Sequence, residues 1–133
     1  MEYPVKKTKE EWKNELPREE FHVLREKGTE PAFQGVYHDH KEEGVYKCKA
    51  CGQTLFSSQT KFDSGTGWPS FYDVASDKSV VLKSDFSFFM KRTEVLCANC
   101  GSHLGHVFKD GPEPTGKRYC MNSIALDFED KKE

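Results

Sequence analysis

The sequence lacks the features of a membrane-spanning or secreted protein. It contains no run of about 18 apolar residues, the length that a helix needs to cross a bilayer. Its first residues, MEYPVKKTKEEWKNEL, contain no apolar signal-peptide core. We therefore expect no membrane partner. As written, the chain is predicted to be cytoplasmic, or to act in an organelle if a targeting segment has been removed.

The sequence also lacks an excess of basic residues and a large share of apolar ones. Its formal net charge is −2, whereas nucleic-acid binding relies on clustered positive charge. Only 35% of its 133 residues are hydrophobic and 32% are charged. A chain of this length forms one domain, and a core of this size often needs a metal or disulfides in addition. We expect one domain that acts as a monomer and binds no nucleic acid.

Helical patterns are confined to the first part of the chain. Thr8 followed by Glu11 is a capping box, which marks the start of a helix. A second short helix is predicted with Pro17 in its first turn and its end at Gly28. We therefore predict a helical arm over residues 8–28.

The remaining chain consists of short stretches rich in Val, Tyr and Phe, separated by Gly, Asp and Ser, which is typical of β-strands. Strands are predicted at 44–48, 53–58, 79–84, 86–97, 103–108 and 118–130. In the last stretch, alternation places Ile124, Leu126 and Phe128 on one face of a half-buried strand. We predict a mainly antiparallel β core over residues 29–128, followed by a charged, disordered tail at 129–133.

Four of the five cysteines form two C-x-x-C pairs, CKACG and CANCG, with 45 residues between them. This spacing lets two thiolates reach one metal from a tight turn, while the following glycine adopts a positive φ and its N–H can point at sulfur. Four thiolates fill a tetrahedral shell, so we predict one structural zinc. Two disulfides are the alternative, and iron in the same site stays open. The predicted ligands are Cys48, Cys51, Cys97 and Cys100.

The fifth cysteine, Cys120, has two cationic neighbours in the sequence, Lys117 and Arg118. Nearby cations lower the pKa of a thiol and favour the thiolate, as a nucleophile requires. Strict alternation places Arg118, Cys120 and Asn122 on the same side as Ile124, where they make a poor core and a reasonable polar pocket. The plainer interpretation is a buried structural cysteine in a strand.

Two histidines and one tryptophan are further candidates. His103 and His106 would face opposite ways in a flat strand, but Gly105 permits a bulge or turn that aims both at one site. Ordinary hydrogen-bonding roles are the alternative for both. Trp68 lies in the glycine-rich stretch FDSGTGWPSF, where burial for packing alone is not expected. An aromatic ring on such a loop could bind an apolar part of a ligand.

Three motifs, in this order, resemble the methionine-R-sulfoxide reductase family, also called MsrB or SelR. They are KFDSGTGWPSF, CANCGSHLGHVFKDGP and GKRYCMNSIAL, and the similarity runs from Gly28 to Leu126. The resemblance implies two antiparallel β-sheets and a structural zinc held by the four cysteines, remote from the active site. It also implies a substrate, methionine-R-sulfoxide, either free or in proteins.

The resemblance implies a role for each matching residue. Cys120 is the nucleophile that attacks the sulfoxide sulfur and becomes a sulfenic acid, while His103 or His106 protonates the oxygen. The implied catalytic residues are Cys120, His103, His106 and Asn122, and the implied substrate-binding residues are Trp68 and Arg118.

One position departs from the family pattern. Many members carry a second, resolving cysteine where this chain has Thr66. With four thiols assigned to zinc, Cys120 has no partner for an internal disulfide. We therefore expect an external thiol reductant, such as thioredoxin, glutathione with glutaredoxin, or a small dithiol.

Two other classes of function fit parts of the sequence. A zinc-stabilised binding module would have the pocket without turnover, and alkylation of Cys120 would leave its binding intact. A cysteine hydrolase would use Cys120 with His103, but no orienting Asp or oxyanion loop is recognisable in the sequence.

Overall fold

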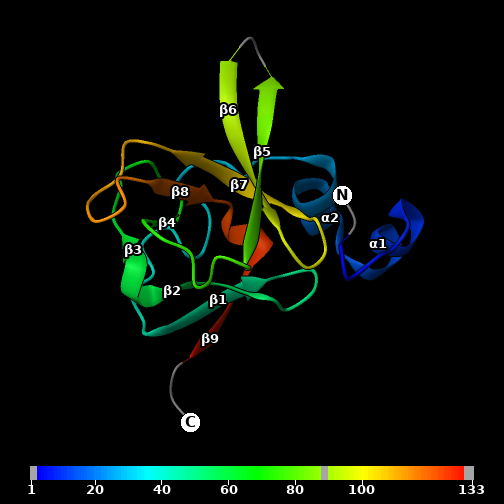
Figure 1. Ribbon diagram of the computed structural model, residues 1–133. Coiled ribbons are helices and arrows are strands. Elements are labelled where there is room, and N and C mark those ends of the chain that lie inside the picture. Colours follow the sequence, from blue (N-terminus) through cyan, green and yellow to red (C-terminus); the bar gives the residue numbers. More distant parts are fainter. Residues whose placement is uncertain (1–2, 88–89, 131–133) are drawn as a thin grey trace.

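The computed structural model describes residues 3–87 and 90–130 (Figure 1). Within these residues, α-helices occur only near the N-terminus and every strand pair is antiparallel. The helices are α1 (Lys9–Glu15) and α2 (Arg18–Glu26), with 3-10 turns η1 (Ser58–Thr60) and η2 (Ser123–Ala125). The strands are β1 (Gly44–Cys48), β2 (Thr54–Ser57), β3 (Lys61–Phe62), β4 (Ser70–Phe71), β5 (Val80–Ser87), β6 (Met90–Cys97), β7 (His103–Phe108), β8 (Arg118–Met121) and β9 (Leu126–Asp130).

The strands form two sheets, which confirms the predicted mainly β fold. The smaller sheet has the order β2-β1-β9, and the larger has the order β3-β4-β8-β7-β6-β5. Aromatic side chains pack between the sheets. Phe56 on β2 stacks on Phe71 on β4 with ring centroids 4.4 Å apart, and Tyr46 on β1 meets Phe71 edge-on at 5.1 Å. All three are fully buried, so they join one sheet to the other.

The two helices pack into the same core. The predicted capping box is confirmed: the Glu11 N–H donates to Thr8 Oγ1, and the Thr8 N–H donates to Glu11 Oε1. Trp12 on α1 and Leu24 on α2 are each 1% exposed. Neither helix, nor any other in the part of the chain described, is long and apolar enough to cross a membrane.

The end of α2 differs from the prediction. Lys27, rather than Gly28, takes the left-handed conformation, with φ of 59°. A Cβ at Gly28 would lie 2.3 Å from the His22 ring, so this exposed side chain would have to shift. The left-handed turn directs Lys27 towards the larger sheet, where its ammonium group meets two carboxylates.

The last predicted strand, 118–130, is not continuous. β8 ends at Met121, and η2 turns the chain into β9, which belongs to the other sheet. Ile124 therefore lies in the turn and not on a strand face. Within β8, Tyr119 and Met121 face the core, while Arg118 and Cys120 face the opposite side. Alternation continued through this break had placed Arg118 and Cys120 on the core side of the strand, and that placement is wrong.

Two smaller boundaries also differ. The predicted stretch 86–97 begins too early, because Phe86 and Ser87 belong to β5, which pairs with β6. Glu129 and Asp130 belong to β9 and pair with β1, so this part of the predicted disordered tail is wrong. Residues 131–133 of that tail lie outside the described residues.

Candidate active site and cysteine cluster

The four cysteines of the two C-x-x-C pairs come together at the turns after β1 and β6 (Figure 1). Their Sγ atoms all lie within 4.8 Å of one another. Cys48 Sγ lies 3.7 Å from Cys100 Sγ, and Cys51 Sγ lies 3.6 Å from Cys97 Sγ. A tetrahedral ion with metal–sulfur bonds of about 2.3 Å needs sulfur–sulfur edges of about 3.8 Å. The cluster fits one such ion, and the alternative of two disulfides is wrong because these thiols are unpaired.

The glycine after each pair has the predicted positive φ, 85° at Gly52 and 78° at Gly101. Their N–H groups do not point at sulfur, however. Gly52 donates to the Cys48 carbonyl and Gly101 to the Cys97 carbonyl, each at 2.8 Å. The two turns therefore close on the backbone and leave the sulfur atoms free to face one another.

Neighbouring polar groups support this cluster. Asn99 Nδ2 donates to Cys51 Sγ at 3.3 Å, which stabilises negative charge on that sulfur. Arg25 on α2 donates to the Cys100 carbonyl at 3.0 Å and to Ser102 Oγ at 3.2 Å. The cysteine cluster is thus tied to the helical part of the molecule.

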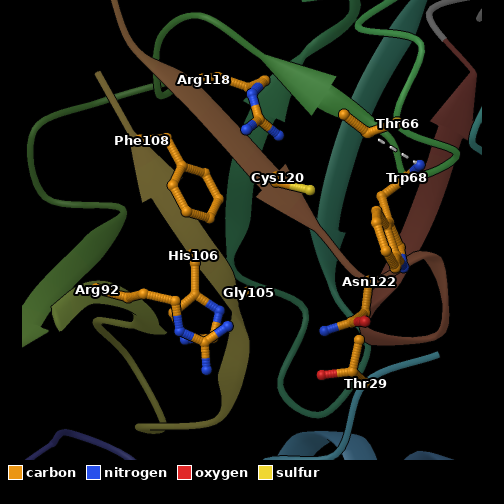
Figure 2. Close-up of a pocket in the computed structure, with 10 residues that line it drawn as sticks. All are labelled: Thr29, Thr66, Trp68, Arg92, Gly105, His106, Phe108, Arg118, Cys120 and Asn122. Atoms are coloured by element: carbon orange, nitrogen blue, oxygen red, sulfur yellow. Dashed lines mark hydrogen bonds between the residues drawn. The ribbon is translucent and has the colours of Figure 1, made fainter. Parts of the chain in front are cut away.

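A cavity of about 230 Å³ lies elsewhere, over strands β7 and β8. Figure 2 shows Cys120 in its middle, with Trp68 and Thr66 on one side and His106 and Phe108 on the other. Of the predicted catalytic and substrate-binding residues, His103 alone does not line this cavity. The lining residues are Thr29, Thr66, Trp68, Arg92, Gly105, His106, Phe108, Arg118, Cys120 and Asn122.

Strand pairing places Cys120 directly between two neighbours. On β8 it is paired with Ser70 on β4 and with His106 on β7. Directly opposite residues of an antiparallel pair point to the same face of the sheet, so His106 and Cys120 both face this cavity. Gly105 is required here, because a Cβ would lie 2.1 Å from the Cys120 carbonyl oxygen.

The predicted bulge next to Gly105 is confirmed. The register between β6 and β7 shifts at this point, since Val95 pairs with Gly105 but Leu96 pairs with His103. The shift brings the rings of His103 and His106 into edge-on contact, with centroids 5.4 Å apart. The histidines do meet, although only His106 reaches the cavity.

Each histidine has its own buried carboxylate. His103 Nδ1 lies 2.7 Å from Glu94 Oε2, and His106 Nε2 lies 2.8 Å from Asp85 Oδ2. Burial lowers the pKa of His106, and the Asp85 carboxylate opposes that shift. The pKa of Glu94 is lowered even though its burial favours the neutral acid, because His103 and Lys27 stabilise its charged form.

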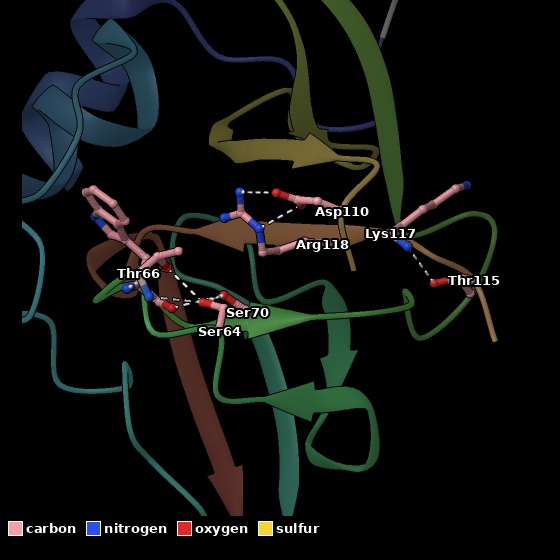
Figure 3. Close-up of polar contacts among 8 residues, drawn as sticks. Ser64, Thr66, Ser70, Asp110, Thr115, Lys117 and Arg118 are labelled. Atoms are coloured by element: carbon pink, nitrogen blue, oxygen red, sulfur yellow. Dashed lines mark hydrogen bonds and ion pairs between the residues drawn. The ribbon is translucent and has the colours of Figure 1, made fainter. Parts of the chain in front are cut away.

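The electrostatic surroundings of Cys120 differ from the expectation. Burial raises the pKa of its thiol, and the Arg118 charge and the Thr66 side chain lower it without reversing that shift. Arg118 has the predicted lowering effect, but the net shift of the Cys120 pKa is upward, so the predicted low pKa is wrong. Lys117 is exposed and points away from the site (Figure 3). Asp110, which contacts Arg118, raises the pKa of Cys120 by less than the Arg118 charge lowers it.

Arg118 is held in place from two sides. Its Nε and Nη2 atoms donate to the two carboxylate oxygens of Asp110 at 2.9 and 3.1 Å (Figure 3). Its guanidinium carbon lies 4.5 Å from the centre of the Phe108 ring. Arg118 is thereby fixed at the cavity wall next to Cys120.

Trp68 is half-buried at the cavity, as the glycine-rich loop had suggested. Its Nε1 atom donates to the Glu30 carbonyl at 2.9 Å. Ser64 braces the loop, because its Oγ lies 2.8 Å from Thr66 Oγ1 and 2.7 Å from Ser70 Oγ (Figure 3). The loop thus holds the indole ring in a defined orientation.

Glu30 also holds Asn122, on the opposite side of the cavity from Arg118 (Figure 2). The Glu30 N–H donates to Asn122 Oδ1 at 3.0 Å, and Asn122 Nδ2 donates to the Leu104 carbonyl at 3.1 Å. The Glu30 carboxylate accepts the Ile124 N–H at 2.9 Å, just after the end of β8. One loop residue therefore positions both Trp68 and Asn122.

Several residues of this site were not found from the sequence. Phe108 could have been, because it lies two positions after His106 and so shares its face of β7. Arg92 and Asp85 reach the site only because β5 and β6 pair beside β7. Nothing in the local pattern connects Glu30 with residues about 90 positions later.

Comparison with known proteins finds a matching family and similar sequences. Residues 16–130 match the SelR domain family. The chain is 64% identical to the peptide methionine sulfoxide reductase MsrB of Methanosarcina barkeri, over 97% of this chain and 91% of that protein. It is 54% identical to the protein of the same name in Leptospira interrogans, over 97% and 98%. It is also 54% identical to the mitochondrial methionine-R-sulfoxide reductase B3 of Mus musculus, over 91% of this chain and 48% of the mouse protein.

Proposed function

The chain belongs to the SelR, or methionine-R-sulfoxide reductase, family, and from this premise we propose that it reduces methionine-R-sulfoxide, free or in proteins, to methionine. The observation that carries the proposal is the pairing of Cys120 with His106 across two strands, at a cavity that also contains Trp68. It joins a nucleophile, a proton carrier and an apolar plate in one small space.

The chemistry of the cavity suits this substrate. A methionine sulfoxide side chain ends in a methyl group on a polar S=O group. Trp68 offers an apolar face for the methyl group, and Asn122 and His106 offer polar groups for the oxygen. Because the sulfoxide sulfur is a stereocentre, a fixed plate, nucleophile and acid accept one epimer, which the family indicates is R.

The reaction needs a proton on the departing oxygen. The raised pKa of Cys120 means that the free enzyme holds mainly the thiol. We infer that His106 takes the thiol proton as Cys120 Sγ attacks the sulfoxide sulfur, and that the imidazolium returns this proton to the oxygen. The protonated oxygen then leaves the substrate sulfur and bonds to Cys120 Sγ while the new sulfur–sulfur bond breaks, so methionine departs reduced by two electrons and Cys120 is oxidised to a sulfenic acid.

Regeneration of the enzyme needs an external reductant. The remaining four cysteines form the separate cluster, and Thr66 occupies the loop beside Cys120. Two thiols of thioredoxin or of another reductant convert the sulfenic acid to a thiol, with release of water and formation of a disulfide in the reductant. Unpaired cysteines of this number fit a reducing compartment such as the cytoplasm.

We assign zinc to the cysteine cluster as a structural ion. A closed shell of four thiolates offers no open position to a substrate, so the ion stabilises the fold and takes no part in the reaction.

A cysteine hydrolase deserves a direct test, because the structure supplies the orienting carboxylate that the sequence did not reveal. Asp85 contacts His106, the cross-strand partner of Cys120, as an acidic residue contacts the histidine of a nucleophile–histidine–acid triad. An ester-hydrolysis assay without reductant measures this activity. Family membership favours the reductase, and we expect no hydrolysis.

The decisive experiment uses both epimers of a methionine sulfoxide substrate with dithiothreitol or thioredoxin. Reduction of the R epimer alone supports the proposal. Equal reduction of the two epimers, or no reduction of either, contradicts it.

A further inference from the structure

Two carboxylates lie behind the histidines, on the side away from Cys120 in the strand order. Asp85 on β5 is 5% exposed and Glu94 on β6 is 2% exposed. Asp85 contacts His106 Nε2 and Glu94 contacts His103 Nδ1, at 2.8 and 2.7 Å. An ionised carboxylate only accepts hydrogen bonds, so each of these ring nitrogens must carry a hydrogen. In their neutral forms, the two histidines are therefore opposite tautomers.

A lysine bridges the two carboxylates. Lys27 Nζ lies 3.6 Å from Asp85 Oδ1 and 3.4 Å from Glu94 Oε1. Arg92 adds a second cation, with Nη2 3.5 Å from Asp85 Oδ2. Two buried negative charges need such compensation, because an unpaired carboxylate in a low-dielectric interior would take up a proton. The cations keep both carboxylates in the form that accepts from histidine.

The left-handed backbone of Lys27 directs this lysine to the carboxylates. It follows the last residue of α2 with φ of 59°, a conformation that is unfavourable for a residue with a Cβ. Glycine, which occupies the next position, adopts this φ without cost but has no ammonium group. A lysine in this unfavourable conformation, between α2 and the larger sheet, is consistent with a role in contacting the two carboxylates.

The free nitrogens of the two histidines are not equivalent. His106 lines the cavity, and its contact with Asp85 leaves Nδ1 as the nitrogen that can exchange a proton there. His103 is 3% exposed, and its Nε2 is buried with no hydrogen-bond partner among the described residues. In the tautomer that Glu94 selects, this nitrogen is an acceptor and has no proton to deliver.

We propose that Asp85 and Glu94, bridged by Lys27, are positioning residues that fix the two histidines in opposite tautomers, so that His106 exchanges protons through Nδ1 and His103 orients it. This inference rests on the proposed reductase function and adds the groups that act behind its proton carrier. Asp85 acts on the reaction through His106, and Glu94 acts through the ring contact of His103 with His106.

The first test needs no variant and no turnover. Long-range proton–nitrogen NMR of the ¹⁵N-labelled wild-type protein, at a pH above the ordinary histidine pKa of about 6.5, reports which ring nitrogen is protonated. We expect the hydrogen on Nδ1 of His103 and on Nε2 of His106. The opposite tautomer at either histidine would overturn the proposal, whether or not the protein reduces sulfoxides.

The second test separates positioning from stability. An amide can donate as well as accept, so Asp85→Asn should leave His106 in a mixture of tautomers. It should lower kcat for methionine-R-sulfoxide by roughly 10- to 100-fold with little change in KM, since general acid–base catalysis contributes about 10²- to 10⁴-fold. The matched control is Asp127→Asn, because Asp127 is an exposed residue of β9. This variant should keep the wild-type kcat and the wild-type His106 spectrum.

Glu94→Gln and Lys27→Met complete the set. Glu94→Gln should disturb the tautomer of His103 and lower kcat less than Asp85→Asn does. Lys27→Met should have the smallest effect, because Arg92 still contacts Asp85. An Asp85→Asn variant with wild-type kcat and an unchanged His106 spectrum overturns the proposal. If a variant fails to fold, the tautomers measured in the wild-type protein decide between keeping and rejecting the proposal. If the wild-type protein reduces no sulfoxide, the proposed reductase function fails, while the tautomer measurement still tests the positioning of the histidines.

Discussion

His106 on β7 and Cys120 on β8 are direct cross-strand partners in the larger sheet. Their side chains point to one face because opposite residues in an antiparallel pair always do. The imidazole and the thiol are therefore set by the register of two strands and not by a mobile loop. A site built on strands holds its geometry without further ordering when a substrate binds.

Replacing Cys120 with Ser should abolish reduction of methionine-R-sulfoxide. An alcohol is essentially never ionised at neutral pH, so the rate should fall by several orders of magnitude. The variant should keep its metal and its melting temperature, because Cys120 lies outside the four-cysteine cluster. A residual rate near a tenth of the wild-type value would show that another group is the nucleophile.

Changing any one cluster cysteine to Ser should release the metal and destabilise the domain. Structural zinc binding contributes directly to folding free energy, so the melting temperature should drop together with the metal content. Elemental analysis of the variants at Cys48, Cys51, Cys97 and Cys100 measures the first effect, and thermal denaturation the second. One equivalent of zinc retained in all four variants would rule out this site. If the wild-type protein contains iron, the predicted identity of the ion is wrong but the predicted ligands stand.

The oxidised enzyme should stop at a sulfenic acid. After one equivalent of methionine-R-sulfoxide without reductant, Cys120 should form a single adduct with dimedone, because the other four cysteines, all among the described residues, form the separate cluster. The zinc should stay bound, since resolution by a cluster cysteine would dismantle the metal site. Mass spectrometry that finds an internal disulfide to Cys120, with zinc released, would contradict the single-cysteine mechanism.

Thr66→Cys should supply the missing internal partner. The Thr66 side chain already lies close enough to affect the Cys120 thiol, and both residues line the same cavity. A disulfide forms when the two Cα atoms are within about 7 Å and the side chains converge. The oxidised product should shift from sulfenic acid to a 66–120 disulfide, and thioredoxin should become a better reductant. Ser64→Cys serves as the comparison from the same loop, and equal disulfide yields would argue against a specific geometry.

The pKa of Cys120 should respond in opposite directions to changes in Asp110 and Arg118. The Asp110 charge raises this pKa and the Arg118 charge lowers it. Asp110→Asn should therefore lower the pKa and speed alkylation of Cys120 at neutral pH, because more thiolate is present. Arg118→Gln should raise the pKa and slow alkylation. The rate of iodoacetamide labelling against pH, read on the Cys120 peptide by mass spectrometry, measures both. A shift of the same sign in the two variants would contradict this account.

Local patterns predicted much of the molecule. The capping box at Thr8, the strand at residues 44–48 and the bulge beside Gly105 depend on residues close in sequence, and each was found as predicted. The spacing of the C-x-x-C pairs indicated a metal cluster because two thiolates on one turn suffice to define half of a tetrahedron. The motifs around Trp68 and Cys120 indicated the family, and with it a cavity that brings those two residues together.

By itself, the sequence determined the residue types available for the reaction: one thiol outside the cluster, two neighbouring histidines and an aromatic residue on a loop. Only the tertiary structure decided which histidine pairs with Cys120 across the strands, that the Cys120 thiol is buried with a raised pKa, and that Asp85 and Glu30 support the site. It also decided that the last strand breaks at η2 and divides between two sheets. These outcomes depend on strand register, burial and contacts between distant segments, because a pKa and a hydrogen-bond partner are properties of the surroundings and not of the local chain.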